Sequence, residues 1–279
     1  MSGSLSITAS TLLALCLGWS SAAAASGLAP LDEALLADAR DGSLDRFDLP
    51  SACLIAGGVA DERELAVHRQ QLADACAAAV RTTPRNSPRD ERAGQLLQAM
   101  HSRVLAGNYD RTASDLRRAL AAGDYNCLSA LVIYHELCSQ AGVPLTLWAV
   151  PGHVYGQVGR TRIEPTCRQW PPPSSAADSV GPPRQLTPLA LVGRFYYNRG
   201  IQLLEQRQFE AGVAAMQAAC KLDPDDADAR ENLLAGLNNW AIELSHENRP
   251  AAVALVARGL EIDPGFAPLL ACERHLRKP

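Results

Sequence analysis

The fold is decided by residues 123–166, which read GDYNCLSALVIYHELCSQAGVPLTLWAVPGHVYGQVGRTRIEPT. Residues 128–141 are apolar on nearly every side of a helical wheel, as is typical of a helix buried in a core. Gly142 is the expected C-terminal stop, and residues 124–126 offer Asp and Asn as capping side chains. The pattern therefore predicts a core helix with Cys127 in its first turn.

This position favours a reactive thiol. The thiolate is the nucleophilic form, and a free cysteine with a pKa of about 8.5 is only a few per cent ionised at neutral pH. A helix N-terminus carries partial positive charge and unpaired N–H groups, and together with an imidazolium it can lower a thiol pKa to about 3.5–7.5. The same N–H groups can bind a developing oxyanion.

A β-hairpin is predicted after the helix, with strands at 153–158 and 161–166 joined by a two-residue turn. If Val158 pairs with Thr161, alternation places the apolar residues on one face. His153 and Glu164 then become diagonal neighbours on the other face, about 7–8 Å apart at the backbone. Glu164 could fix the tautomer of the imidazole and support its charge, whereas a one-residue slip would move Glu164 to the opposite face.

Each of these residues alone is more often structural than functional. A lone buried cysteine is usually a small hydrophobe, and a lone strand histidine usually packs or bonds locally. The order of helix-start cysteine, strand histidine and next-strand carboxylate instead indicates a thiol nucleophile with its base and its orienting acid.

Three short motifs carry a family resemblance: Tyr125-Asn-Cys127-Leu-Ser, Pro151-Gly-His153-Val and Ile163-Glu164-Pro-Thr166. They resemble the core motifs of the transglutaminase-like superfamily, a circularly rearranged relative of the papain fold, over about residues 90–166. The resemblance implies Cys127 as nucleophile, His153 as base and Glu164 as the acid. Many members carry Asp at the third position, so Glu departs from that pattern by one methylene. The oxyanion side chain of some members has no counterpart here, which leaves the backbone N–H of Cys127.

The expected fold class is α+β. Residues 28–167 are predicted to form the transglutaminase-like domain, in which a helical N-terminal part leads to the core helix and a small antiparallel sheet. Within that part, Asp61 is the expected cap of a helix over 62–80, and residues 82–88 are a turn-rich break. Residues 168–188, rich in proline, are predicted to be a linker or surface loop.

Residues 189–279 resemble tetratricopeptide helix pairs. Small residues at expected crossings and the Asp-Pro pairs at 223–224 and 263–264 support this. Two units with a capping helix fall short of the three or so repeats needed for independent stability. We therefore expect the region to dock on the catalytic core, where it serves either as a concave surface for protein partners or as a brace.

The N-terminus resembles a secretory signal. Residues 1–31 contain no charge, and an apolar centre is followed by Ser and Ala residues, with cleavage expected after Ala24 or Ala25. A basic residue near Met1 is missing, and the apolar run is short for a membrane span. We assign residues 1–25 to the signal and predict export to a periplasm or the exterior, with an Ala/Ser-rich tail as the alternative.

Composition and cysteine spacing narrow the classes further. The net charge of −4 and the lack of a basic run argue against nucleic acid as a partner. CxxC and HExxH spacings are absent, so neither a metal nor another cofactor is implied. Of eight cysteines, one lies in the predicted signal. The other seven could be free thiols or could form disulfides, for which the possible pairs are Cys53–Cys76, Cys138–Cys167 and Cys220–Cys272.

Two functions from different classes follow. The first is an exported thiol-dependent enzyme that transfers the acyl group of a peptide or side-chain amide, by hydrolysis or transamidation, with Tyr125, Asn126 and Trp170 beside the oxyanion or substrate. The second is an inactive scaffold that binds protein partners through the helical repeats. An intact set of Cys, His and acid favours the enzyme.

Overall fold

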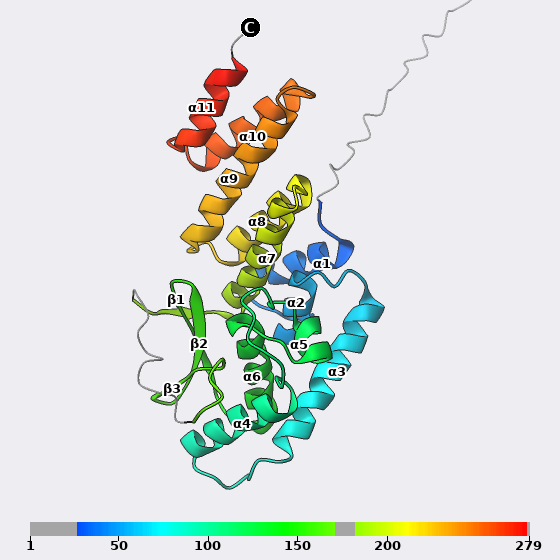
Figure 1. The fold of residues 1–279 in the computed structure, drawn as a ribbon, viewed down its shortest axis with the longest axis vertical. Helices are drawn as coiled ribbons and strands as arrows, with labels where there is room; N and C mark the ends of the chain where they lie inside the picture. Colours follow the sequence, from blue (N-terminus) through cyan, green and yellow to red (C-terminus); the bar gives the residue numbers. More distant parts are fainter. Residues whose placement is uncertain (1–26, 171–181, 278–279) are drawn as a thin grey trace, which may run out of the picture.

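The computed structural model describes residues 27–170 and 182–277. Within these residues the chain is α+β, with eleven α-helices and one four-stranded antiparallel sheet (Figure 1). The first six helices and a 3-10 turn lead to the sheet; they are α1 (Pro30–Asp38), η1 (Ala39–Asp41), α2 (Leu49–Ala56), α3 (Glu62–Val80), α4 (Arg89–Arg103), α5 (Leu116–Ala122) and α6 (Cys127–Ala141).

Helix α6 is the centre of the body, as predicted. Its N-cap is Asn126, and it ends at Gly142, whose φ of 67° is the left-handed conformation that glycine adopts without strain. Leu131, Val132 and Ile133 on consecutive positions are fully buried, because α2, α3 and α4 pack on one side of α6 and strand β2 on the other. The expected cap of α3 is also present, since Asp61 accepts a hydrogen bond from the Glu64 N–H.

The sheet has the order β3-β2-β1-β4. Its strands are β1 (Thr146–Val150), β2 (His153–Val158), β3 (Thr161–Ile163) and β4 (Arg184–Leu186). The β2–β3 register pairs Val158 with Thr161 and Gly156 with Ile163, which confirms the predicted hairpin register. This register puts Val154, Val158 and Ile163 into the core, so the opposite face of β2 presents His153.

Strand β4 corrects the assignment of residues 168–188 to a linker. Its residues 184–186 pair with β1, and Leu186 lies opposite Leu147 in the buried layer. The segment is only three residues long and follows a Pro/Gly-rich stretch, so it carries no periodicity to read. Residues 171–181 lie outside the described residues.

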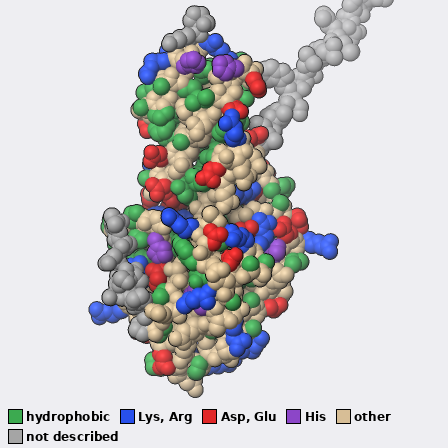
Figure 2. Space-filling model, in the orientation of Figure 1, with side chains coloured by type: hydrophobic (Ala, Val, Ile, Leu, Met, Phe, Trp, Pro, Cys, Tyr) green, Lys and Arg blue, Asp and Glu red, His purple; other side chains and the backbone are tan. Residues whose placement is uncertain are grey.

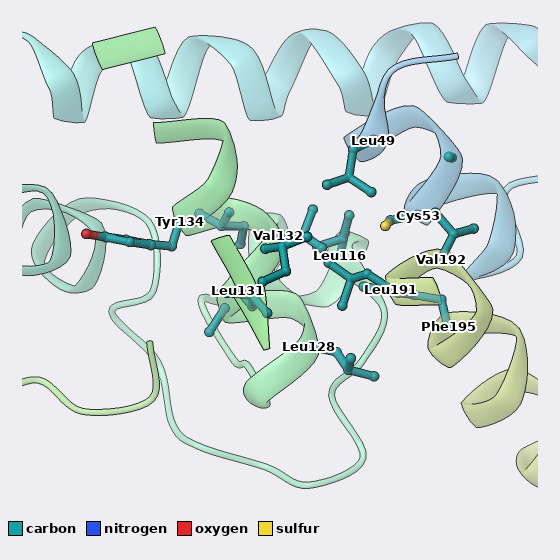
Figure 3. Close-up of a cluster of buried hydrophobic side chains, with 14 of the residues drawn as sticks. Leu49, Cys53, Leu116, Leu128, Leu131, Val132, Tyr134, Leu191, Val192 and Phe195 are labelled. Atoms are coloured by element: carbon teal, nitrogen blue, oxygen red, sulfur yellow. The ribbon is translucent and has the colours of Figure 1, made fainter. Parts of the chain in front are cut away.

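Five helices follow the sheet: α7 (Pro188–Glu205), α8 (Phe209–Leu222), α9 (Ala227–Leu244), α10 (Arg249–Ile262) and α11 (Ala267–Leu276). They stack in sequence and rise from the body as a column (Figure 1). Leu191, Val192 and Phe195 of α7 lie in the same buried cluster as side chains of α2, α5 and α6 (Figure 3).

The junction between body and column is packed and also bonded. On α7, Tyr196 donates a 2.8 Å hydrogen bond to Asp32 of α1, and Arg199 pairs with the same carboxylate at 2.9 Å. A separate cluster of apolar residues packs α9, α10 and α11 against one another. The expectation that the helical region docks on the core is therefore confirmed for α7 and α8, and the predicted boundary at residue 189 does not divide the core.

The predicted signal, residues 1–25, falls outside the described residues. Among the helices that the structure describes, none combines the length and the apolarity that crossing a membrane requires. All seven cysteines of the described residues are free thiols, so the three disulfide pairings considered from the sequence are not formed.

Candidate active site

Cys127 is the first residue of α6 and is partly exposed. The side chain of Asn126 caps the helix by accepting hydrogen bonds from Leu128 N at 2.9 Å and from Ser129 N at 3.1 Å. Asn126 is itself held, because its amide nitrogen donates to the carbonyl of Arg111 at 3.2 Å. The cap does not use the backbone N–H of Cys127. This N–H lies at the N-terminal end of α6, where the helix dipole is positive.

His153 links the thiol to the carboxylate. Its Nε2 lies 2.8 Å from Oε1 of Glu164, and its ring lines the same cleft as the Cys127 side chain, with which it interacts electrostatically. Because Nε2 is engaged by Glu164, Nδ1 is the nitrogen left for the thiol. The structure therefore brings together the three side chains singled out from the sequence: Cys127 at the start of α6, His153 at the start of β2 and Glu164 directly after β3, which ends at Ile163 and is shorter than the strand predicted over 161–166.

The pKa of His153 is raised to about 9. Burial alone would lower it, but hydrogen bonds to Cys127 and Glu164 and the charges of both groups outweigh the burial. The imidazole is therefore held in its cationic form near neutral pH. A cationic ring next to a helix-start thiol is the environment in which a thiolate is stabilised.

Glu164 is fixed from several sides and is only 5% exposed. Oε1 also accepts a hydrogen bond from the hydroxyl of Thr166 at 3.1 Å, and Oε2 lies 3.4 Å from the guanidinium of Arg162. That guanidinium in turn stacks on the ring of Tyr155 at 3.8 Å. Because its partners are set before any ligand arrives, the carboxylate can hold the imidazole in one orientation.

A second histidine holds the segment that carries Glu164. His101 of α4 is buried, and its Nε2 lies 2.9 Å from the carbonyl oxygen of Pro165, so Nε2–H is the donor. The pKa of His101 is lowered because burial outweighs that bond. Unlike His153, it has no carboxylate among its partners in the described residues, so it remains neutral. Its role is to hold the backbone of Pro165, next to Glu164, in place.

The three residues expected beside the site are distributed differently. Asn126 lines the cleft at Cys127. Tyr125 is buried beneath it, against the rings of His101 and Tyr109. Trp170 corrects the prediction: its indole packs against Gly94 of α4, where a Cβ would come within 2.3 Å of it, and it is not among the residues that line the cleft.

The thiol and the imidazole open into a cleft of about 250 Å³. One wall comes from the body and the other from the column, and the column residues were not expected from the sequence. Those residues are Arg194, Tyr197 and Asn198 of α7 and Asp228 of α9. Near this junction, acidic and basic side chains lie close together on the surface (Figure 2). Only the packing of α7 on the body brings these positions to Cys127, so no local motif could have identified them.

Comparison with protein-family models, with curated proteins and with solved structures finds no match to this chain. Within the described residues, no group of three or more His, Cys, Asp and Glu side chains is placed to hold a metal ion. What the site can do chemically therefore has to be argued from the thiol, the imidazole and the carboxylate.

Proposed function

We propose that the protein is a thiol-dependent enzyme that transfers the acyl group of peptide or side-chain amides, with Cys127, His153 and Glu164 as its triad. The observation that carries this proposal is an imidazole that is hydrogen-bonded to a buried carboxylate and shares one cleft with the thiol at the start of α6. The motif resemblance to the transglutaminase-like superfamily supports the same chemistry. The N-terminal apolar segment followed by Ser and Ala residues, which resembles a secretory signal, supports export as the setting.

The reaction proceeds in two stages. The Cys127 thiolate attacks the amide carbonyl and forms a C–S bond, while the oxyanion faces the N–H groups at the start of α6. The His153 imidazolium then gives its proton to the leaving amine, the C–N bond breaks and a thioester remains. Neutral His153 next takes a proton from water or an amine, which attacks the thioester; the C–S bond breaks and Cys127 leaves as the thiolate beside the imidazolium. Glu164 keeps the imidazole oriented throughout.

Water as the second reactant gives hydrolysis, and an amine gives transamidation. The triad serves both, because it activates either nucleophile in the same way. We propose hydrolysis as the first activity to assay. No cofactor enters either route.

The alternative function is that of an inactive scaffold. One observation favours it: the outer column exposes large apolar side chains, with Ile242 at 53%, Val253 at 48% and Ile262 at 40% exposure. Such residues can contact a protein partner. They are three separate positions on two helices, α9 and α10, however, and single exposed apolar residues are normal for a protein surface.

Alkylation of the full chain with iodoacetamide at about pH 6 separates the two functions. An ordinary thiol is less than about 1% ionised there, so an ion-paired Cys127 should react about tenfold faster once the lower nucleophilicity of a low-pKa thiolate is included. Cys167 and Cys220 are partly exposed and serve as references in the same sample, quantified by peptide mass spectrometry.

The substitution His153→Ala should reduce the Cys127 rate to that of the references. His246→Ala, at an exposed position on the column, is the matched control and should change nothing. If Cys127 in the wild type labels no faster than Cys167 and Cys220, the enzyme proposal is wrong and the scaffold function remains.

A further inference from the structure

The cleft at Cys127 does not end there. A second cavity of about 370 Å³ borders it, and Gly152, Arg194 and Asp228 line both. The second cavity continues past the β1–β2 turn to the loop between α8 and α9. The two cavities together form one groove, which leads from the thiol along the junction of body and column.

The charged side chains in and around this groove differ in whether they already have a partner within the fold. Asp223 is buried and pairs with Arg184 at 2.6 Å. Asp226 caps α9 by accepting from Ala229 N, and it lies 3.6 Å from Arg194. Asp223 and Asp226 therefore already have partners within the fold, and the charge of Arg194 is paired with Asp226.

Asp225 and Asp228 are different. Both are exposed, and their carboxylates have no hydrogen bond or ion pair to any of the described residues; Asp225 lines the second cavity, whereas Asp228 lines both. The charge of Asp228 reaches into the groove, because after burial it is the next cause of the raised pKa of Tyr197 on the facing helix α7. An aspartate in the first turn stabilises a helix whichever side of the helix it lies on. That role therefore does not require Asp228 to face the groove.

Asn198 is another uncommitted group. It is partly buried in the wall at α7, and its side-chain amide has no hydrogen-bond partner among the described residues. A primary amide offers one acceptor and two donors, which matches the C=O and N–H of a peptide unit. An amide in the same cleft as the thiol, with the free carboxylates of Asp228 and Asp225 along the groove, is complementary to a peptide that carries a cation.

Building on the acyl-transfer function proposed above, we propose that α7 and α9 select the substrate: Asn198 binds the main chain of a peptide, and Asp228 binds a Lys or Arg side chain near the reacting carbonyl. Asn198 and Asp228 are then specificity-determining residues contributed by the column. The inferred substrate class is a basic peptide or an exposed basic segment of a protein.

The test uses electrophilic peptide probes that alkylate Cys127, namely tripeptidyl chloromethyl ketones with Lys or norleucine placed in turn at each position. Wild-type protein should react about fivefold faster with the Lys probe than with the norleucine probe at one position, the size expected for an exposed ion pair. Asp228→Asn should remove this ratio by slowing the reaction with the Lys probe. Glu231→Gln, an exposed position on α9 that does not line the groove, is the matched control and should keep the ratio.

Asn198→Ala should slow the Lys and norleucine probes alike, and Asp228→Lys should turn the preference toward a Glu probe. Equal rates for Lys and norleucine at every position, or a ratio that survives Asp228→Asn, would overturn the inference. Iodoacetamide distinguishes the two failures. Fast, unselective labelling of Cys127 would leave the acyl-transfer proposal intact, whereas slow labelling by iodoacetamide would end both.

Discussion

The two walls of the cleft differ in how their polar groups are used. On the body wall, Asn126 lines the cleft and Glu164 lies behind His153, and both are buried and hydrogen-bonded to neighbours within the fold. On the column wall, Asn198 and Asp228 are more exposed and have no such partners among the described residues. An amide and a carboxylate therefore hold neighbouring residues in place on one side of the cleft, whereas an amide and a carboxylate on the other side have no partner within the described residues. Preorganised groups suit chemistry, and uncommitted groups suit the binding of a ligand.

The largest expected difference between the walls concerns pH. His153 has its pKa raised from 6.5 to about 9, so its charged form stabilises the folded state fully below about pH 6.5, and this contribution is lost as the pH rises through about 9. We expect wild type to lose about 2–3 kcal/mol of unfolding free energy between pH 6 and pH 9.5 relative to His153→Ala. Urea denaturation at both pH values measures this. Asp228→Asn should keep the wild-type dependence, and an identical pH slope for wild type and His153→Ala would contradict the assignment.

A smaller difference is expected between the two asparagines. Asn126→Ala removes the cap of α6 and should lower the free energy of unfolding by about 1–2 kcal/mol. Asn198→Ala removes no bond within the described residues and lies in a helix that accepts alanine, so the change should stay within about 0.5 kcal/mol. Urea denaturation of both variants under the same conditions gives the comparison. Equal losses would mean that Asn198 is structural as well.

The smallest effect separates the two carboxylates. Glu164→Gln keeps the shape of the side chain but removes the charge that supports the imidazolium, so alkylation of Cys127 by iodoacetamide at about pH 6 should slow by about threefold. Asp228→Asn should leave that rate unchanged, because its carboxylate touches neither the thiol nor the ring. A slower rate in Asp228→Asn would show that the column wall also tunes the thiol.

The body wall could be predicted because its determinants are local. The cap, the apolar run and the turn at 159–160 fix where Cys127 lies on its helix and how His153 faces Glu164 across the hairpin. Period-2 alternation left one register compatible with a buried face, and the structure has that register. The coarse α+β class and the helix pairs at the C-terminus follow from periodicity in the same way.

The column wall could not be predicted, because it depends on contacts between distant segments. Nothing near Asn198 or Asp228 in the sequence indicates that they lie opposite Cys127; this follows from the packing of α7 against α2 and α6. Strand β4 was missed because three residues are too short to show a period. Trp170 was misplaced because sequence proximity to Glu164 was taken as spatial proximity to the thiol, whereas the indole fits against Gly94.

Strand β4 also has a consequence for engineering this protein. It pairs with β1 at one edge of the sheet, and the same sheet carries His153 on β2. Arg184, at the start of β4, is also hydrogen-bonded to Asp223 at the end of α8. The start of the column is thus fastened twice, through β4 to the sheet and through Arg184 to the end of α8. A chimera that exchanges the helical column for another must take its new residues from position 184 onward, because a cut at residue 189 would separate β4 and Arg184 from the helices that they hold.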